Sequence, residues 1–310
     1  MSAAAKALPT GQILLGNAVE RLRDLPAASV DCVITSPPYF RLRDYGVPGQ
    51  LGLEGHVDQW VEELRVVTRA LARVLKPTGT FWLNLGDTYS THPREGAPAK
   101  SLLGAPERLL LALVEDGWTI RNKVIWAKTN PMPSSVTDRL STTHEYLYLL
   151  TRSPRYYFDL DAIREPHRSR PPQRRRGPRP GKYAAGTPAL GPNSDGDDGL
   201  RALKARGMIG HPLGKNPGDV WPMATAHFRG AHLATYPETL VRRIIRAGCP
   251  PGGNVLDPFM GAGTTALVAE AEDRQWIGIE LNPDFIQQAE ARLAAARAAR
   301  DAQLNRKEVT

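Results

Sequence analysis

The sequence is poor in cysteine and has no long hydrophobic run. Only two cysteines occur, Cys32 and Cys249, so neither a disulfide framework nor a zinc cluster built on cysteine can form. No stretch approaches the roughly 18 apolar residues of a membrane span, and residues 1–6 lack the apolar segment of a signal peptide. We therefore expect a cytoplasmic protein without a membrane segment and without a bound metal.

Acidic residues are also scarce relative to basic ones. The 310 residues include 40 Lys and Arg against 32 Asp and Glu, a formal net charge of +8. The excess is concentrated in 164–182, which holds eight Lys or Arg, five Pro and a single acid, Glu165. Such a segment cannot form a core, so it is either an arm that orders on phosphates or a solvated linker. We favour the arm, with nucleic-acid contacts from Arg168, Arg170, Arg174, Arg175, Arg176 and Arg179.

Hydrophobic periodicity is missing between about 163 and 219, whereas strand and helix patterns alternate on both sides of this gap. The alternation predicts an α/β fold, with a first half over 12–162, a Pro/Arg-rich insert over 163–219 and a second half over 220–300. The segments expected before the insert are strands 12–15, 30–35, 80–85, 123–127 and 145–151, a short helix ending near 25, and helices 57–75 and 106–115. Those expected after it are helix 237–247, strand 254–257, a helix from 262, strand 276–280 and a helix from 283.

A glycine-rich string, Asp257-Pro258-Phe259-Met260-Gly261-Ala262-Gly263-Thr264-Thr265, joins an expected strand to an expected helix. Such a turn presents backbone N–H groups to an anion or a nucleoside. No lysine follows Gly263, which disfavours a phosphate-binding Walker loop. Glu280 instead ends the next strand about 20 residues on, where a carboxylate holds ribose hydroxyls in Rossmann-like sheets. The string therefore predicts a site for a nucleoside-like ligand.

A second string, Thr35-Ser36-Pro37-Pro38-Tyr39, ends the expected strand 30–35. Its prolines lack N–H donors and hold carbonyl groups outward, although a purely structural turn could also use them. If the Ser36 hydroxyl and the Pro37 carbonyl accept the two N–H groups of a nucleobase amine, the nitrogen can direct its lone pair at a methyl donor. The donor would be a sulfonium, and the base would be flipped out of the duplex to stack on Tyr39.

In this order, the two strings resemble the amino-methylating DNA methyltransferases of the β arrangement, in which the acceptor motif precedes the S-adenosylmethionine motif. The resemblance covers roughly 12–292, with 163–219 unmatched. It implies a Rossmann-like S-adenosylmethionine-dependent methyltransferase sheet with a circularly rearranged motif order, and a small inserted region that recognises double-stranded DNA. In that family Ser-Pro-Pro-Tyr is most often associated with cytosine-N4 methylation and Asp-Pro-Pro-Tyr with adenine-N6, so cytosine is favoured and adenine is the second choice.

The resemblance also implies roles for individual residues. It assigns the chemistry to Ser36, Pro37, Pro38 and Tyr39. It assigns donor binding to Asn17, Thr35, Thr235, Asp257, Pro258, Phe259, Gly261, Gly263, Thr264, Thr265, Glu280 and Asn282. The segment 232–237 resembles the part that surrounds the donor's methionine moiety, although many relatives have Gln-Lys-Pro where this chain has Tyr236-Pro237. The segment 144–146, His-Glu-Tyr, resembles the strand that closes the flipped-base pocket.

Other functions stay open at this point. A DNA-binding or regulatory module could keep the sheet and lose catalysis, and it would then bind the donor without transferring methyl. Methylation of RNA or of a protein amide would use the same acceptor chemistry. The family likeness is also compatible with a cognate restriction endonuclease and with a homodimer.

Overall fold

The computed structural model describes residues 7–167, 211–226 and 236–308. The chain divides into two units, one made of Met1–Asp159 and Gly218–Thr310 and the other of Leu160–Pro217. In the described part of the second unit, Glu165 and Lys215 pair as an antiparallel bridge and form an ion pair of 3.1 Å. This unit overlaps the range 163–219, whose role in DNA recognition stays a prediction. The six arginines predicted to bind DNA lie outside the described residues.

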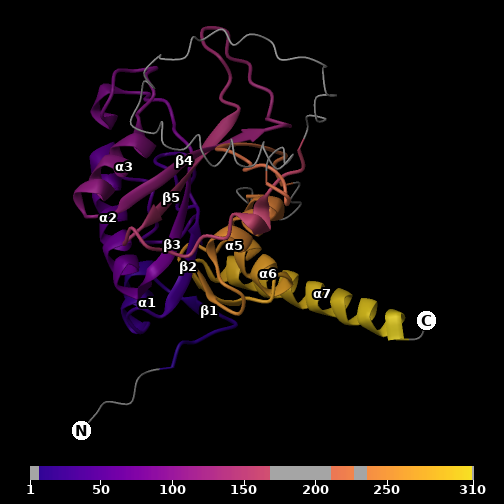
Figure 1. Ribbon diagram of the computed structural model, residues 1–310. Coiled ribbons are helices and arrows are strands. Elements are labelled where there is room, and N and C mark those ends of the chain that lie inside the picture. The colour runs from indigo at the N-terminus through magenta and orange to yellow at the C-terminus, as the bar shows by residue number, and fades with distance from the viewer. Residues whose placement is uncertain (1–6, 168–210, 227–235, 309–310) are drawn as a thin grey trace, which may run out of the picture. The chain divides into compact units, whose positions relative to one another are not determined.

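The first unit is built on a mixed sheet (Figure 1). In spatial order its strands are β1 (Gln12–Leu15), β8 (Gln275–Glu280), β7 (Asn254–Asp257), β2 (Val30–Thr35), β3 (Leu75–Leu85), β5 (His144–Thr151), β4 (Thr119–Lys128) and β6 (Val220–Met223). The neighbours from β1 to β3 pair in parallel, as expected for strands joined by helical crossovers. The α/β fold class predicted from the alternation of segments is confirmed.

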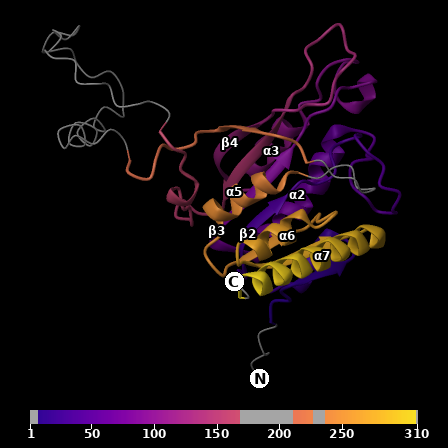
Figure 2. The ribbon, with the colours of Figure 1, turned by 90° about the vertical axis from the view of Figure 1, so that its right-hand side faces the viewer.

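Helices cover both faces of the sheet, with α1, α2 and α3 to one side and α5, α6 and α7 to the other (Figures 1 and 2). Their bounds are α1 Ala18–Asp24, α2 Val57–Val74, α3 Ala105–Glu115, α5 Glu238–Gly248, α6 Thr264–Ala271 and α7 Pro283–Glu308, with short 3₁₀ turns at Pro93–Glu95 and Asp161–Ile163. No helix in the described ranges is long and apolar enough to cross a membrane. The helices thus leave the carboxyl ends of the parallel strands open for a site.

Helix α2 shows how the sequence dictates its own packing. Its start is capped reciprocally, because the His56 ring accepts from the Asp58 N–H and the Gln59 side chain accepts from the His56 N–H. Every third or fourth side chain is buried, which turns one stripe toward the sheet. The buried residues are Val57, Trp60, Val61, Leu64, Val67, Thr68, Leu71 and Val74.

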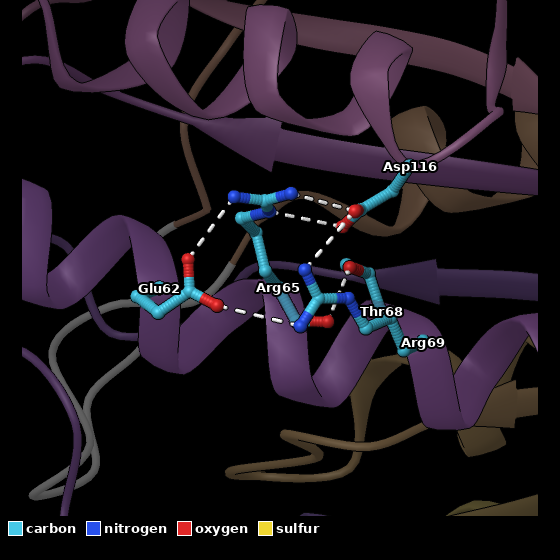
Figure 3. A network of polar contacts seen from close by, with 5 residues as sticks. All are labelled: Glu62, Arg65, Thr68, Arg69 and Asp116. Atoms are coloured by element: carbon cyan, nitrogen blue, oxygen red, sulfur yellow. Dashed lines mark hydrogen bonds and ion pairs between the residues drawn. The ribbon is translucent and has the colours of Figure 1, made fainter.

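A polar network on the outer side of α2 ties this helix to the end of α3 (Figure 3). Arg65 binds both carboxylate oxygens of Asp116 at 3.0 and 2.7 Å, and Arg69 adds a bond of 3.1 Å to the same carboxylate. Glu62 pairs with both arginines. The pKa of Asp116 is lowered to about 2, chiefly by its hydrogen bonds from Arg65. The network therefore fixes α3 beside α2 through an ionised carboxylate.

Three details differ from the sequence expectations. The expected helix 57–75 and strand 80–85 leave 76–79 outside both, but these four residues belong to β3. This strand starts at Leu75, because Leu75 pairs with Val30 before a bulge. Strand β5 runs antiparallel to β3 and β4, a direction that the alternation of segments does not predict. Strand β6 was not expected, because it contains Pro222, and a proline inside a short run argues against a strand.

Candidate methyl-transfer site

The two predicted strings meet because β2 and β7 are neighbours in the sheet. Cys32 and Val33 of β2 lie opposite Val255 and Leu256 of β7, so the carboxyl ends of both strands reach the same edge. From β2 the chain crosses over to β3 on one side, whereas from β7 it crosses over to β8 on the other side. Open α/β sheets bind ligands at the point where the crossovers change direction in this way.

Asp257 holds the two strand ends together. Its Oδ1 accepts from the Thr35 hydroxyl at 2.7 Å, across 222 positions of sequence, and from the Phe259 N–H at 3.1 Å. Its Oδ2 accepts from the Tyr236 hydroxyl at 2.7 Å and the Thr265 hydroxyl at 2.6 Å. The side chain is fully buried, and this burial raises the pKa of Asp257 while its hydrogen bonds lower it. The carboxylate therefore links the end of β2, which carries the Ser-Pro-Pro-Tyr string (the acceptor string), to the glycine-rich turn after β7 (the donor turn).

A cavity of about 390 Å³ opens at this edge and brings most of the predicted site residues together. Those that line it are Asn17, Ser36, Pro37, Pro38, Tyr39, Pro258, Phe259, Gly261, Thr264, Glu280 and Asn282. Thr35, Asp257 and Thr265 are buried beside it, within the hydrogen-bonded cluster just described. Gly263 starts α6 with a φ of +78° and sits against Ala289. Thr235 lies outside the described residues.

On the donor side, Glu280 is fixed by two backbone groups. Its Oε2 accepts from the Gly261 N–H and its Oε1 from the Asn282 N–H, both at 2.8 Å. Burial raises the pKa of Glu280. Each carboxylate oxygen keeps a further lone pair for hydroxyl groups, beside the glycine turn and the Phe259 ring. These residue types fit a nucleoside, with the carboxylate for ribose and the ring for a base.

Two neighbours complete this wall of the cavity. Asn17 caps α1, since its side chain accepts from the Val19 N–H at 2.8 Å. Tyr45, from the loop after the acceptor string, meets Phe285 edge-to-face at 6.2 Å, and the Asn282 amide donates to the Tyr45 carbonyl at 3.4 Å. The loop after the Ser-Pro-Pro-Tyr string and the segment after β8 thus form one wall of the cavity.

On the acceptor side, the two proline carbonyls differ. The Trp60 indole N–H donates to the Pro38 carbonyl at 2.9 Å, so α2 holds the string from behind. No described residue donates a hydrogen bond to the Pro37 carbonyl, and Pro37 lines the cavity. The Pro37 carbonyl therefore has no partner among the described residues, and its role as an acceptor for an amine stays a prediction.

A polar chain runs from the acceptor string into the antiparallel strands. The Ser36 hydroxyl donates to the Tyr39 hydroxyl at 3.1 Å, and the Tyr39 hydroxyl donates to Glu145 Oε2 at 2.7 Å. Glu145 also accepts from Lys128 at 2.6 Å and from Asn84 at 3.1 Å. Burial, and next the charge of Glu145, raises the pKa of Tyr39 well above its usual value. Lys128 and Asn84 were missed by sequence reasoning, because each is a single polar residue inside a strand and belongs to no motif.

Within the described residues no group of three or more His, Cys, Asp and Glu could hold a metal ion. Cys32 and Cys249 are both buried and carry free thiols.

Comparisons with known proteins agree with this geometry. A family model described as DNA methylase, for N6- and N4-directed enzymes, matches residues 30–291. The type II methyltransferase M.Cfr9I of Citrobacter freundii is 38% identical over 299 residues, covering 90% of this chain and 86% of its own. M.SmaI of Serratia marcescens is 35% identical over 307 residues, covering 92% and 91%.

Solved structures share the fold at lower identity. The PvuII DNA methyltransferase (cytosine-N4-specific) aligns with a TM-score of 0.62 and 20% identity, covering 91% of this chain and 86% of that one. The protein TTHA0409 of Thermus thermophilus, solved with S-adenosylmethionine, aligns with a TM-score of 0.58 and 24% identity, covering 92% of this chain and 93% of that one.

Proposed function

Because this chain belongs to the N6/N4 DNA methylase family and is therefore an S-adenosylmethionine-dependent DNA methyltransferase, we propose that it methylates the N4 amine of cytosine at a specific site in duplex DNA. One observation carries the proposal: the Ser-Pro-Pro-Tyr string and the donor turn line the same cavity. The cavity is large enough for a flipped base beside part of the donor.

The residues of the donor side fit S-adenosylmethionine. Glu280 would bind the ribose hydroxyls, Phe259 would pack on the adenine, and the turn at Gly261 lets the backbone approach closely. When bound, S-adenosylmethionine supplies a methyl group that its sulfonium charge already activates. The residues of the chain therefore have to bind, orient and exclude water, with no need for a covalent enzyme intermediate.

The residues of the acceptor side fit an amine. Ser36 Oγ and the Pro37 carbonyl would accept hydrogen bonds from its two N–H groups. The neighbouring Pro38 carbonyl would not bind the amine, because it already accepts from the Trp60 indole N–H. Preorganised acceptors of this kind stabilise the positive charge that develops on the amine nitrogen.

The choice of cytosine rests on the acceptor string, which has Ser36 where adenine-directed relatives most often have aspartate. The PvuII enzyme, which shares the fold, is by its name cytosine-N4-specific. Target recognition would fall to the basic insert at 163–219, because eight Lys and Arg in 164–182 suit a phosphate backbone. The type II names of the relatives support a role beside a restriction endonuclease.

Replacing Ser36 with alanine tests this assignment. The single-turnover rate of methyl transfer should fall about 100-fold, the usual loss for one preorganised polar partner of a transition state. S-adenosylmethionine affinity, measured by calorimetry, should stay unchanged, because Ser36 faces the amine. Ser101→Ala is the matched control, since the Ser101 hydroxyl bonds to the Leu102 carbonyl away from the cavity. A Ser36→Ala rate equal to that of the control would contradict the proposed role.

A further inference from the structure

Glu145 ends a chain of hydroxyl groups that begins at the proposed amine acceptor. Ser36 and Tyr39 belong to the acceptor string, whereas Glu145 comes from β5, 106 positions beyond Tyr39. All three residues line the cavity. Neither the family model nor the relatives' names assign a role to Glu145.

The partners of Glu145 dictate which way the protons of this chain point. Lys128 donates a hydrogen bond of 2.6 Å to Oε1, and the two side chains form an ion pair. An ionised carboxylate can only accept, so the Tyr39 hydroxyl must donate to it. The Tyr39 oxygen is then available to accept the Ser36 proton. As a result, Ser36 Oγ keeps its lone pairs for a ligand in the cavity.

The surroundings hold this geometry in place. Asn84 uses both amide protons, one on Glu145 Oε2 at 3.1 Å and one on the Tyr146 carbonyl at 3.0 Å. Gly86 leaves room for the Tyr39 ring, since a Cβ there would lie 2.8 Å from Tyr39 Cε2. The chain of hydroxyls is therefore built by four separate segments, which a simple structural turn would not require.

We propose that Glu145 is a positioning residue that draws the amine proton away from the base through Ser36 and Tyr39; this inference rests on the proposed methylation of a nucleobase amine. As the nitrogen bonds to the methyl carbon, the carbon–sulfur electron pair stays on sulfur, the N–H proton passes to Ser36 Oγ, the Ser36 proton to Tyr39 and the Tyr39 proton to Glu145. No oxidant or further reactant is needed. The positive charge that passes from the sulfonium to the base is thus cancelled by the negative charge of Glu145, which becomes a neutral carboxyl group.

The test compares Glu145→Gln, Tyr39→Phe and the double variant in single turnover with saturating S-adenosylmethionine and duplex DNA. Each single variant should lose about 100-fold in rate, within the usual range for proton transfer by a positioned group. The double variant should be no slower than either single one, because the chain is already cut. Tyr148→Phe is the matched control: Tyr148 is a buried tyrosine on β5 whose hydroxyl has no hydrogen-bond partner among the described residues.

A second readout separates proton relay from a structural effect. The wild-type rate should be slower in D₂O, and this solvent isotope effect should vanish in Glu145→Gln and Tyr39→Phe, while calorimetric affinity for S-adenosylmethionine stays unchanged. Wild-type rates that are equal in both solvents would overturn the relay, even if the variants do not fold. A Tyr39→Phe rate equal to wild type would overturn it as well. If the wild-type protein methylates no base amine, the proposed function fails; if it does and the variants are unaffected, only the relay fails.

Discussion

Replacing Thr35 with valine removes the one hydroxyl that ties the acceptor strand to Asp257. Valine is nearly isosteric with threonine, so the buried carboxylate loses one of its four donors without a cavity. A hydrogen bond to a charged group contributes about 1.5–3 kcal/mol, so the free energy of unfolding should fall by about 2 kcal/mol. Urea denaturation followed by tryptophan fluorescence measures this loss.

Thr151→Val is the matched control. The Thr151 hydroxyl is equally buried, but it donates to the neutral carbonyl of Ser153 at 3.1 Å. Removing a neutral hydrogen bond should lower the free energy of unfolding by only about 1 kcal/mol. The difference between the two variants therefore isolates the charge on Asp257.

The pH dependence of the Thr35→Val loss gives a sharper test. Burial raises the folded-state pKa of Asp257, and the Thr35 bond opposes that rise. A carboxyl group with a raised pKa favours the folded state most at low pH, and this contribution is lost as pH rises from about 4 through the folded-state pKa. Because the variant raises this pKa further, its stability deficit should grow with pH, whereas the deficit of Thr151→Val should stay constant. Equal, pH-independent deficits would refute the role given to Asp257.

Two other predictions concern Gly86, beside the Tyr39 ring, and Asp116, in the network between α2 and α3. Gly86→Ala should slow methyl transfer at least about tenfold, because the added Cβ would press on the Tyr39 ring. The control Gly55→Ala should leave the rate unchanged, because its Cβ would meet only Gln59 Oε1 at 3.6 Å. Equal rates for the two variants would contradict the placement of Tyr39. Asp116→Asn should lose the stability that the lowered pKa of Asp116 provides, so the gap to wild type in urea titrations should be full above about pH 4 and close as pH falls toward 2. A gap that is constant over this range would show that Asp116 is not held ionised.

Much of the fold follows from local patterns in the sequence. The fully buried run at β2 and the short run at β7 predicted strands that end at the two strings, and the structure confirms both bounds. The direction of β5 leaves no trace in a period-two pattern, because a strand reads the same in either orientation. Its antiparallel pairing could therefore not be predicted from periodicity.

The candidate site divides along the same line. Residues in contiguous strings, such as Ser36 and Phe259, could be predicted because their spacing and residue types carry the chemistry. Lys128 could not, because its partner Glu145 lies on a neighbouring strand and only the register brings Lys128 into the cavity. Tyr39 was predicted as a stacking face; the structure adds a hydroxyl that is bonded to Glu145.

The most direct measurement is transfer of labelled methyl from S-adenosylmethionine to duplex DNA, followed by mass spectrometry of the digested nucleosides. N4-methylcytosine is the expected product, with a single base labelled in each target site. N6-methyladenine would keep the amine chemistry but contradict the choice of base, and the absence of label on any DNA would contradict methylation of DNA by this chain.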